Sequence, residues 1–259
     1  MVWRLRGLRL YPDPQVPPMA ARPKARRPVR ERKMTMKKTA RILRTQFVTH
    51  DVKQFIVERP EGYEFTPGQA TLVSINQPGL DDEDHSRPFT FTSLEEDRVL
   101  EFTIKGYFDH DGVTRKLHGL RPGDELVLRD VWGTITYKGP GVFIAGGAGL
   151  TPFLAILRRL AADGRMTGHK LIFANKTRGD VIDWMELAHH LGDDLILAFS
   201  QEKVPGAHHG RVTREFLAER IDDFSQHFYV CGPPPMIDSV MKALKDLGAE
   251  ADSLVFEEG

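Results

Sequence analysis

Cysteine and long apolar runs are nearly absent from this sequence. Cys231 is the single cysteine among 259 residues. One thiol excludes a disulfide within the chain, and it excludes an iron–sulfur cluster held by four cysteines of the same chain. No apolar run approaches the roughly 18 residues of a membrane-spanning helix, so we expect no membrane span. A cytoplasmic protein, whose thiols stay reduced, fits both absences.

Net charge is absent as well, because 36 Lys and Arg balance 36 Asp and Glu. The balance hides a split: residues 1–38 hold twelve of the basic residues and two of the acidic ones. This segment carries a charge of +10, and the remaining chain carries −10. An acidic body argues against a groove for nucleic acid, so we expect no nucleic-acid partner.

Residues 1–38 are rich in Arg and Pro and show little apolar periodicity. They lack the apolar core of a secretory signal and the serine content of a transit peptide. Three interpretations remain: a disordered basic tail, a basic tether for nucleic acid or membrane, or a segment upstream of a true start at Met34 or Met36. We favour the tail and the upstream start over the tether.

From residue 39 onward, short strand-like runs alternate with turns. The turns contain Pro-Gly pairs at Pro67, Pro78 and Pro122. Strands are expected at 42–48, 52–57, 70–75, 89–91, 99–104 and 125–128. This spacing predicts a small antiparallel β-barrel or sandwich domain over 39–137.

After Thr136 the pattern changes to strands that alternate with helices. Strands are expected at 142–145, 171–174, 195–199, 228–231 and 254–256, and helices at 152–162, 183–191, 213–219 and 235–247. The alternation predicts an α/β domain with a parallel sheet over 138–259. Ligands of such sheets bind at the carboxyl ends of the strands.

The most informative turn of this second region is Gly146-Gly147-Ala148-Gly149, which follows an apolar strand and precedes a helix opened by Thr151 and Pro152. Glycines let a ligand approach the backbone, and the free N–H groups of a helix start favour an anion such as a dinucleotide pyrophosphate. The turn departs from the G-x-G-x-x-G pattern, since Pro152 occupies the place of the third glycine. A tight turn without a ligand is the alternative.

Two further patterns lie in the barrel region. In Arg87-Pro88-Phe89-Thr90, the arginine can bind a phosphate, the aromatic ring can lie on a flavin, and the hydroxyl can bond a ring nitrogen. In Gly112-Val113-Thr114, the threonine can cap a helix and offer its hydroxyl to a phosphate. The alternatives are a strand with an edge proline and a helix cap without a ligand.

Metal ligands are not expected. His208 and His209 are adjacent and have no third partner in the sequence, so we interpret them as solvated loop residues. The acidic run Asp81-Asp82-Glu83-Asp84 is interpreted as a solvated loop.

Taken in order, these motifs resemble the ferredoxin–NADP reductase superfamily, which includes flavodoxin, flavin and cytochrome b5 reductases. The resemblance covers residues 40–259. It rests on the Arg87–Thr90 flavin motif, the phosphate turn at Gly112 and the dinucleotide turn at Gly146. It also rests on Phe65-Thr66-Pro67-Gly68-Gln69, Cys231-Gly232-Pro233-Pro234-Pro235-Met236 and Phe256-Glu257.

The resemblance implies roles for these residues. Thr90 would bond flavin N5, Phe89 would stack on the ring, and Cys231 would lie near the nicotinamide C4, with Glu257 assisting proton movement. Thr90, Cys231 and Glu257 are therefore the expected catalytic residues. The expected cofactor-binding residues are Arg87, Pro88, Phe89, Thr90, Lys105, Gly112, Val113, Thr114, Gly146, Gly147, Gly149, Thr151, Pro152, Asn175, Ser200, Gln201, Cys231, Gly232, Pro233, Pro234, Met236 and Phe256.

The cofactors implied are FAD, preferred over FMN, and NADH or NADPH as hydride donor. The turn at Gly112 provides for a pyrophosphate, and Tyr107 or Phe108 is available to an adenine. Gln201 and Glu202 stand where NADPH-selective relatives tend to have an arginine, which tilts the choice toward NADH. Lys203 and Arg211 remain available to a 2′-phosphate.

The function implied is a flavin-dependent oxidoreductase that passes electrons from NAD(P)H to a carrier protein such as ferredoxin or flavodoxin. Three alternatives stay open: an NAD(P)H:flavin reductase, the reductase component of a multi-component oxygenase, and a non-catalytic subunit that docks a flavin.

Overall fold

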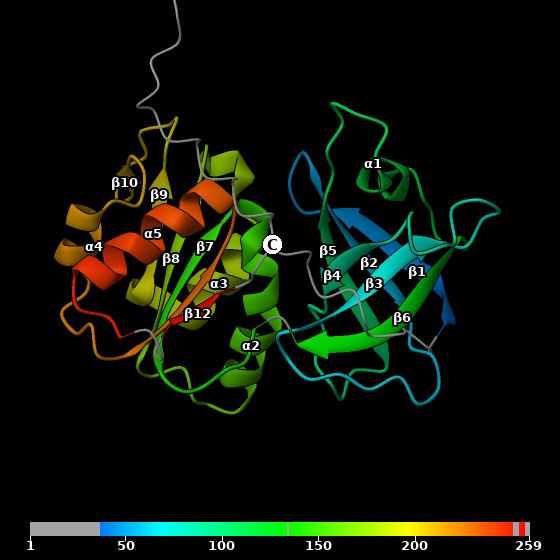
Figure 1. Ribbon diagram of the computed structural model, residues 1–259, viewed down its shortest axis with the longest axis horizontal. Coiled ribbons are helices and arrows are strands. Elements are labelled where there is room, and N and C mark those ends of the chain that lie inside the picture. Colours follow the sequence, from blue (N-terminus) through cyan, green and yellow to red (C-terminus); the bar gives the residue numbers. More distant parts are fainter. Residues whose placement is uncertain (1–36, 134, 251–253, 257–259) are drawn as a thin grey trace, which may run out of the picture. The chain divides into compact units, whose positions relative to one another are not determined.

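The computed structural model describes residues 37–133, 135–250 and 254–256, so Glu257 and residues 1–36 of the 1–38 segment lie outside them. Lys38, which we expected in that segment, belongs to the first strand. The described chain forms two six-stranded sheets (Figure 1). None of its helices is long and apolar enough to cross a membrane.

The first sheet is antiparallel, with the strand order β4-β3-β6-β1-β2-β5. Its elements are β1 (Lys38–Phe47), β2 (Val52–Glu58), β3 (Gln69–Ile75), β4 (Arg87–Thr90), β5 (Val99–Lys105), α1 (Val113–His118) and β6 (Glu125–Gly133). The turn before β3 requires glycine at position 68, because Gly68 has a φ of +90° and a Cβ there would lie 2.2 Å from the carbonyl oxygen of Ile135. The sheet closes over an apolar core that includes Phe55, Phe91 and Phe102.

The second sheet is parallel, with the order β10-β9-β8-β7-β11-β12. Its strands are β7 (Gly141–Gly146), β8 (His169–Asn175), β9 (Leu195–Phe199), β10 (His208–His209), β11 (His227–Cys231) and β12 (Leu254–Phe256). The helices are η1 (Gly147–Leu150), α2 (Thr151–Ala162), η2 (Arg178–Asp180), α3 (Trp184–Leu191), η3 (Gly192–Asp194), α4 (Arg214–Arg220) and α5 (Pro234–Asp246).

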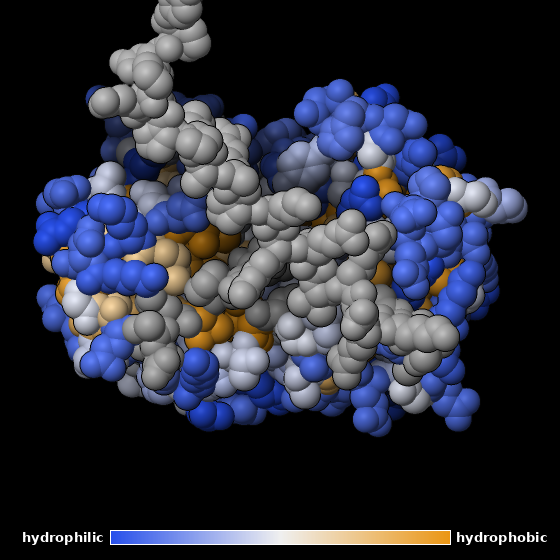
Figure 2. Space-filling model, in the orientation of Figure 1, coloured by the Kyte–Doolittle hydropathy of each residue, from blue (hydrophilic) through white to orange (hydrophobic). Residues whose placement is uncertain are grey.

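Helices cover both faces of this sheet. Alternate residues of β7 point to opposite faces, so Phe143 packs with α2 and α3 whereas Val142 and Ile144 pack with α4 and α5. Figure 2 shows apolar residues in the area of α5 within an otherwise mostly hydrophilic face of the described chain. The chain starts this sheet at β7 and adds strands on one side before it returns to the other, so the strand order reverses between β7 and β11. Ligands bind at such a reversal.

The expected fold class, an antiparallel barrel followed by a parallel α/β sheet, is confirmed. One local expectation is wrong, since His208 and His209 form the edge strand β10 instead of a loop. The side chain of His208 packs on Phe216 with ring centroids 4.2 Å apart, and this contact with α4 explains the ordered conformation.

Candidate functional site

A cleft of about 760 Å³ runs along the carboxyl ends of the parallel strands. Gly146 ends β7, Asn175 ends β8 and Cys231 ends β11, and all three line the cleft, together with Ser200 just after β9. Three residues of the first sheet region complete the lining: Val52, Lys105 and Tyr107. The cleft therefore lies at the reversal of strand order and is shared by both sheets.

The glycine turn forms the floor of the cleft. Gly147 adopts a φ of +54°, which favours glycine, and a Cβ on Gly149 would lie 2.4 Å from the carbonyl oxygen of Cys231. No side-chain cap bonds the N–H groups at the start of η1, which begins at Gly147 and leads directly into α2, where Thr151 also lines the cleft. Uncapped N–H groups at a helix start suit an anion, so the geometry supports the expected phosphate site.

Asn175 is the residue of this cleft whose side chain best fits a polar ligand. The residue is 8% exposed, and neither its side-chain oxygen nor its side-chain nitrogen has a hydrogen-bond partner among the described residues. Its backbone is held in place, since the Ser200 amide donates to the Asn175 carbonyl at 3.0 Å. Buried amides without partners are costly, so the side chain is expected to bond a polar ligand.

Cys231 and the residues after it form one wall of the cleft. Cys231 is buried at the end of β11, and Gly232, Pro233, Pro234 and Met236 follow it along the lining. This turn lies against the glycine turn, because a Cβ on Gly232 would be 3.2 Å from the Cα of Gly146. The two turns predicted to frame a nicotinamide dinucleotide therefore adjoin each other.

Positive charge predominates in the cleft. Lys105, Lys176 and Arg211 line it, and Asp180 is the acidic residue among the lining residues. Lys105 forms an ion pair with Asp51. Burial raises the pKa of Asp51, but the hydrogen bond and charge of Lys105 outweigh this effect and lower the pKa overall. An excess of cations suits the phosphates of a dinucleotide.

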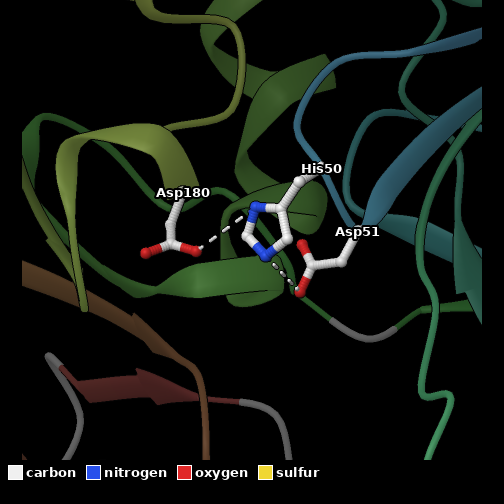
Figure 3. A group of neighbouring side chains, drawn as sticks. All are labelled: His50, Asp51 and Asp180. Carbon is white, nitrogen blue, oxygen red and sulfur yellow. Dashed lines mark ion pairs between the residues drawn. The ribbon is translucent and has the colours of Figure 1, made fainter.

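His50 lies between two carboxylates beside the cleft (Figure 3). Its Nε2 is 3.6 Å from Asp51 Oδ2, and its Nδ1 is 3.9 Å from Asp180 Oδ1. These three side chains offer ligand atoms within 4.8 Å of one another. Asp51 already binds Lys105, whose ammonium repels cations, and Asp180 Oδ2 accepts two hydrogen bonds of 2.7 Å from Thr177. We therefore interpret the group as a bridge between the turn before β2 and η2.

Thr90, on β4, is a second buried polar residue whose side chain fits a ligand. Its side chain is buried, with 6% of the residue exposed, and Oγ1 has no hydrogen-bond partner in the described part of the chain. A hydroxyl in this condition fits a ligand that bears a hydrogen-bonding ring atom. Phe89 beside it is half-buried against the barrel core, and exposed Arg87 donates to the Ser86 carbonyl at 2.6 Å.

The turn at Gly112 differs from the expectation in one respect. Gly112 itself is the N-cap of α1, without a side-chain hydrogen bond, so the capping role predicted for Thr114 is wrong. Thr114 Oγ1 instead accepts from the Tyr107 amide at 3.3 Å, which orders the preceding loop. Tyr107 and Phe108 are 50% and 49% exposed, and Tyr107 lines the cleft, so an aromatic surface is available to a planar ligand.

The expected residues divide into two groups. The cleft brings together Lys105, Gly146, Gly147, Gly149, Thr151, Asn175, Ser200, Cys231, Gly232, Pro233, Pro234 and Met236. Its lining does not include Arg87, Pro88, Phe89, Thr90, Gly112, Val113, Thr114, Pro152 or Gln201. The Phe256 side chain and Glu257 lie outside the described residues.

Sequence reasoning missed Lys176, Asp180 and Ser239, which also line the cleft. Lys176 follows β8 directly, and Asp180 lies in η2, the next element along the chain. Extending the rule that ligands bind at strand carboxyl ends to the first residues after each strand would have found both.

Comparisons with known proteins agree with this geometry. Residues 143–242 match the family model described as an oxidoreductase NAD-binding domain. The reductase component of propane 2-monooxygenase from Rhodococcus jostii (strain RHA1) is 29% identical over 84% of this chain and 62% of its own length. NADH-cytochrome b5 reductase 1 from Kluyveromyces lactis is 30% identical over 71% of this chain and 69% of its own length.

The fold also has close structural neighbours. The flavohem-like FAD/NAD-binding domain of nitric oxide dioxygenase from Vibrio cholerae superposes with a TM-score of 0.75 and 24% identity, over 85% of this chain and 97% of that domain. The chain belongs to the ferredoxin–NADP reductase superfamily, whose members include the cytochrome b5 reductases. It spans less than two thirds of the length of the propane monooxygenase reductase that it matches, since the share is 62%.

Proposed function

We propose that the chain is an NAD(P)H-dependent flavoprotein reductase that hands electrons to a carrier protein. The observation that carries this proposal is the cleft at the β7/β11 reversal, which joins the uncapped glycine turn of η1 to the unpartnered amide of Asn175. The unpartnered hydroxyl of Thr90 supports a second cofactor, on the first sheet. We keep residues 39–137 as the flavin domain and 138–259 as the nicotinamide domain.

The chain's own residues would bind and orient two cofactors. The N–H groups of the glycine turn at the start of η1 would hold the pyrophosphate of the nicotinamide dinucleotide, and Asn175 would bond the adjoining part of it. Cys231, at the end of β11, would lie against the nicotinamide. FAD, when bound, supplies the chemistry: it accepts a hydride from the dihydronicotinamide and later releases electrons to an acceptor.

On the flavin side, Thr90 Oγ1 would donate a hydrogen bond to the flavin ring and so hold the reacting edge in place. Phe89 would cover the ring, and Arg87 with the turn at Gly112 would bind phosphates. Holding two reactants in fixed orientation can lower a barrier by roughly 7–11 kcal/mol. Glu257 remains the proposed assistant to proton movement.

The proposed acceptor is an oxygenase component or a small carrier such as ferredoxin. The oxygenase reading draws support from the relative named as a propane 2-monooxygenase reductase component. One cysteine in the chain means that a four-cysteine iron–sulfur relay would have to lie on another chain. NADH and NADPH are both retained as donors, because Lys176 and Arg211 line the cleft with Ser200 while Glu202 is engaged by the Arg178 amide at 2.7 Å. We propose the cytoplasm as the location.

The test is an anaerobic titration of the purified protein with NADH and, separately, NADPH. The flavin is released from one sample of the protein and identified. In a second, intact sample, the absorbance of the bound flavin is followed during the titration. We expect bound FAD, loss of its yellow absorbance with at least one donor, and cytochrome c reduction only after a carrier is added. A protein that oxidises neither donor would leave the flavin-docking subunit as the correct interpretation, and loosely bound flavin would favour the flavin reductase.

A further inference from the structure

Arg158 connects the two sheets through a partly buried set of hydrogen bonds. The residue lies on α2, the helix that begins directly after the glycine turn. Its Nη1 donates to the Thr92 carbonyl and to Glu101 Oε1, both at 2.6 Å, on the side of the first sheet. Its Nε and Nη2 donate to the two carboxylate oxygens of Glu186 on α3, at 2.5 and 2.7 Å. The side chain is 18% exposed.

The contact with the first sheet falls beside the proposed flavin site. Thr92 follows Thr90 by two residues and is fully buried. Its amide donates to the Glu101 carbonyl at 2.9 Å, and its hydroxyl donates to Glu101 Oε1 at 2.8 Å. Arg158 thus holds the backbone that continues from Thr90, and it does so from the helix that carries the dinucleotide turn.

The charges around Arg158 make this contact hard to replace. Glu101, Glu186 and Asp183 surround a single guanidinium. Burial lowers the pKa of Arg158, but hydrogen bonds and charges from Glu186 and Glu101 outweigh it and raise the pKa, so the group stays charged. Weakening one partner of a buried ion pair leaves the others uncompensated.

The neighbouring Arg159 offers a natural contrast. It also reaches the first sheet region, through Glu95 and Glu96, but the side chains of these partners are 39% and 55% exposed and the contacts involve side chains alone. Exposed ion pairs fix geometry weakly.

We propose that Arg158 is a positioning residue that fixes the Thr90 segment against the helix of the glycine turn and thereby sets the rate of hydride transfer. Arg158 does not line the cleft, so it acts through Thr92 and α2 and not through contact with the dinucleotide. The inference rests on the proposed function, because it assumes a flavin at Thr90 and a nicotinamide at the glycine turn. A misplacement of about 1 Å between reacting groups can cost about 100-fold in rate.

The experiment compares Arg158→Lys with the matched control Arg159→Lys. Lysine keeps the charge but cannot bond Thr92, Glu101 and Glu186 from a planar fork. In Arg158→Lys we expect the limiting rate of flavin reduction to fall by about 10- to 100-fold. Flavin content and the Kd for NAD⁺ should stay close to wild type. In the ligand-free protein, amide hydrogen exchange over 90–103 and α2 should accelerate in this variant only.

Three outcomes overturn the proposal: an unchanged limiting rate, a loss explained by a weaker Kd, or an equal effect of Arg159→Lys. If Arg158→Lys fails to retain flavin, Glu101→Gln takes its place, since it keeps the acceptor oxygen and removes one charge. A wild-type rate in Glu101→Gln, or loss of flavin in both variants, also overturns it. A wild-type protein that never reduces flavin contradicts the proposed function instead. The hydrogen-exchange comparison then still tests whether Arg158 holds the Thr90 segment against α2.

Discussion

Replacing Thr90 by valine should have opposite effects on the empty and the flavin-loaded protein. The buried Oγ1 of Thr90 has no hydrogen-bond partner among the described residues. An unsatisfied buried hydroxyl costs about 1–3 kcal/mol. Valine has nearly the same shape and the same preference for strands, so Thr90→Val should raise the free energy of unfolding of the flavin-free protein by about 1 kcal/mol or more.

With flavin bound, the sign should reverse, because the hydroxyl then has a partner. The lost hydrogen bond should destabilise the loaded protein by about 0.5–1.5 kcal/mol. Added to the gain of about 1 kcal/mol in the flavin-free protein, this loss means that flavin binding weakens by about 1.5–2.5 kcal/mol, a factor of about 13 to 70 in Kd. Flavin reduction by the nicotinamide should also slow, since the reacting edge is held less firmly.

The matched control is Thr71→Val on the adjacent strand β3. Thr71 is fully buried, but its Oγ1 bonds the Tyr63 hydroxyl at 2.8 Å and the Arg129 carbonyl at 2.9 Å. The same substitution should therefore destabilise the flavin-free protein by about 1–3 kcal/mol. Urea unfolding of both variants with and without FAD measures all four values. Destabilisation of the flavin-free protein by both variants alike would refute the reasoning.

Two other predictions concern Asp183, which precedes α3, and Asn175, which ends β8. Burial raises the pKa of Asp183 to about 6, although Arg158 acts in the opposite direction. The folded protein then binds this proton more tightly than the unfolded chain, so its stability falls as pH rises from about 4 to about 6. Asn tolerates the φ of +49° at this position, and the stability advantage of Asp183→Asn should grow by up to about 3 kcal/mol between pH 4 and pH 7. A difference in the free energy of unfolding between Asp183→Asn and wild type that does not change with pH would contradict this prediction. Asn175→Ala should raise the Kd of NAD⁺ by about 10-fold with flavin content unchanged, because two hydrogen bonds are lost, whereas exposed Asn76→Ala should not. Calorimetric titration of both variants decides the point.

Local patterns in the sequence were sufficient for the fold class. Apolar strands such as 142–145 and glycine turns such as the one at Gly146 depend on neighbours along the chain, so their structure can be predicted from short windows. The helix start at Pro152 was predicted for the same reason, and α2 begins at Thr151. The N-cap of α1 was not predicted correctly, because Thr114 Oγ1 accepts a hydrogen bond from the Tyr107 amide instead of capping its own helix.

Contacts between distant segments could not be predicted from the sequence. Arg158 lies 57 residues from Glu101 and 66 from Thr92, and nothing in either segment alone indicates the pairing. The unpartnered state of Asn175 and Thr90 likewise depends on burial by several segments at once. Family resemblance supplied roles for both residues. The structure adds a physical reason to expect a ligand at each.

The most direct test of the central claim is the rate of flavin reduction by NADH or NADPH that carries deuterium in place of the transferred hydrogen at C4. Hydride transfer within the cleft predicts rapid loss of the flavin absorbance in anaerobic stopped-flow mixing, and a slower loss with the deuterated donor. No loss of absorbance with either donor would contradict the account. An equal limiting rate of flavin reduction for the deuterated and the ordinary donor, both at saturating concentration, would contradict it as well.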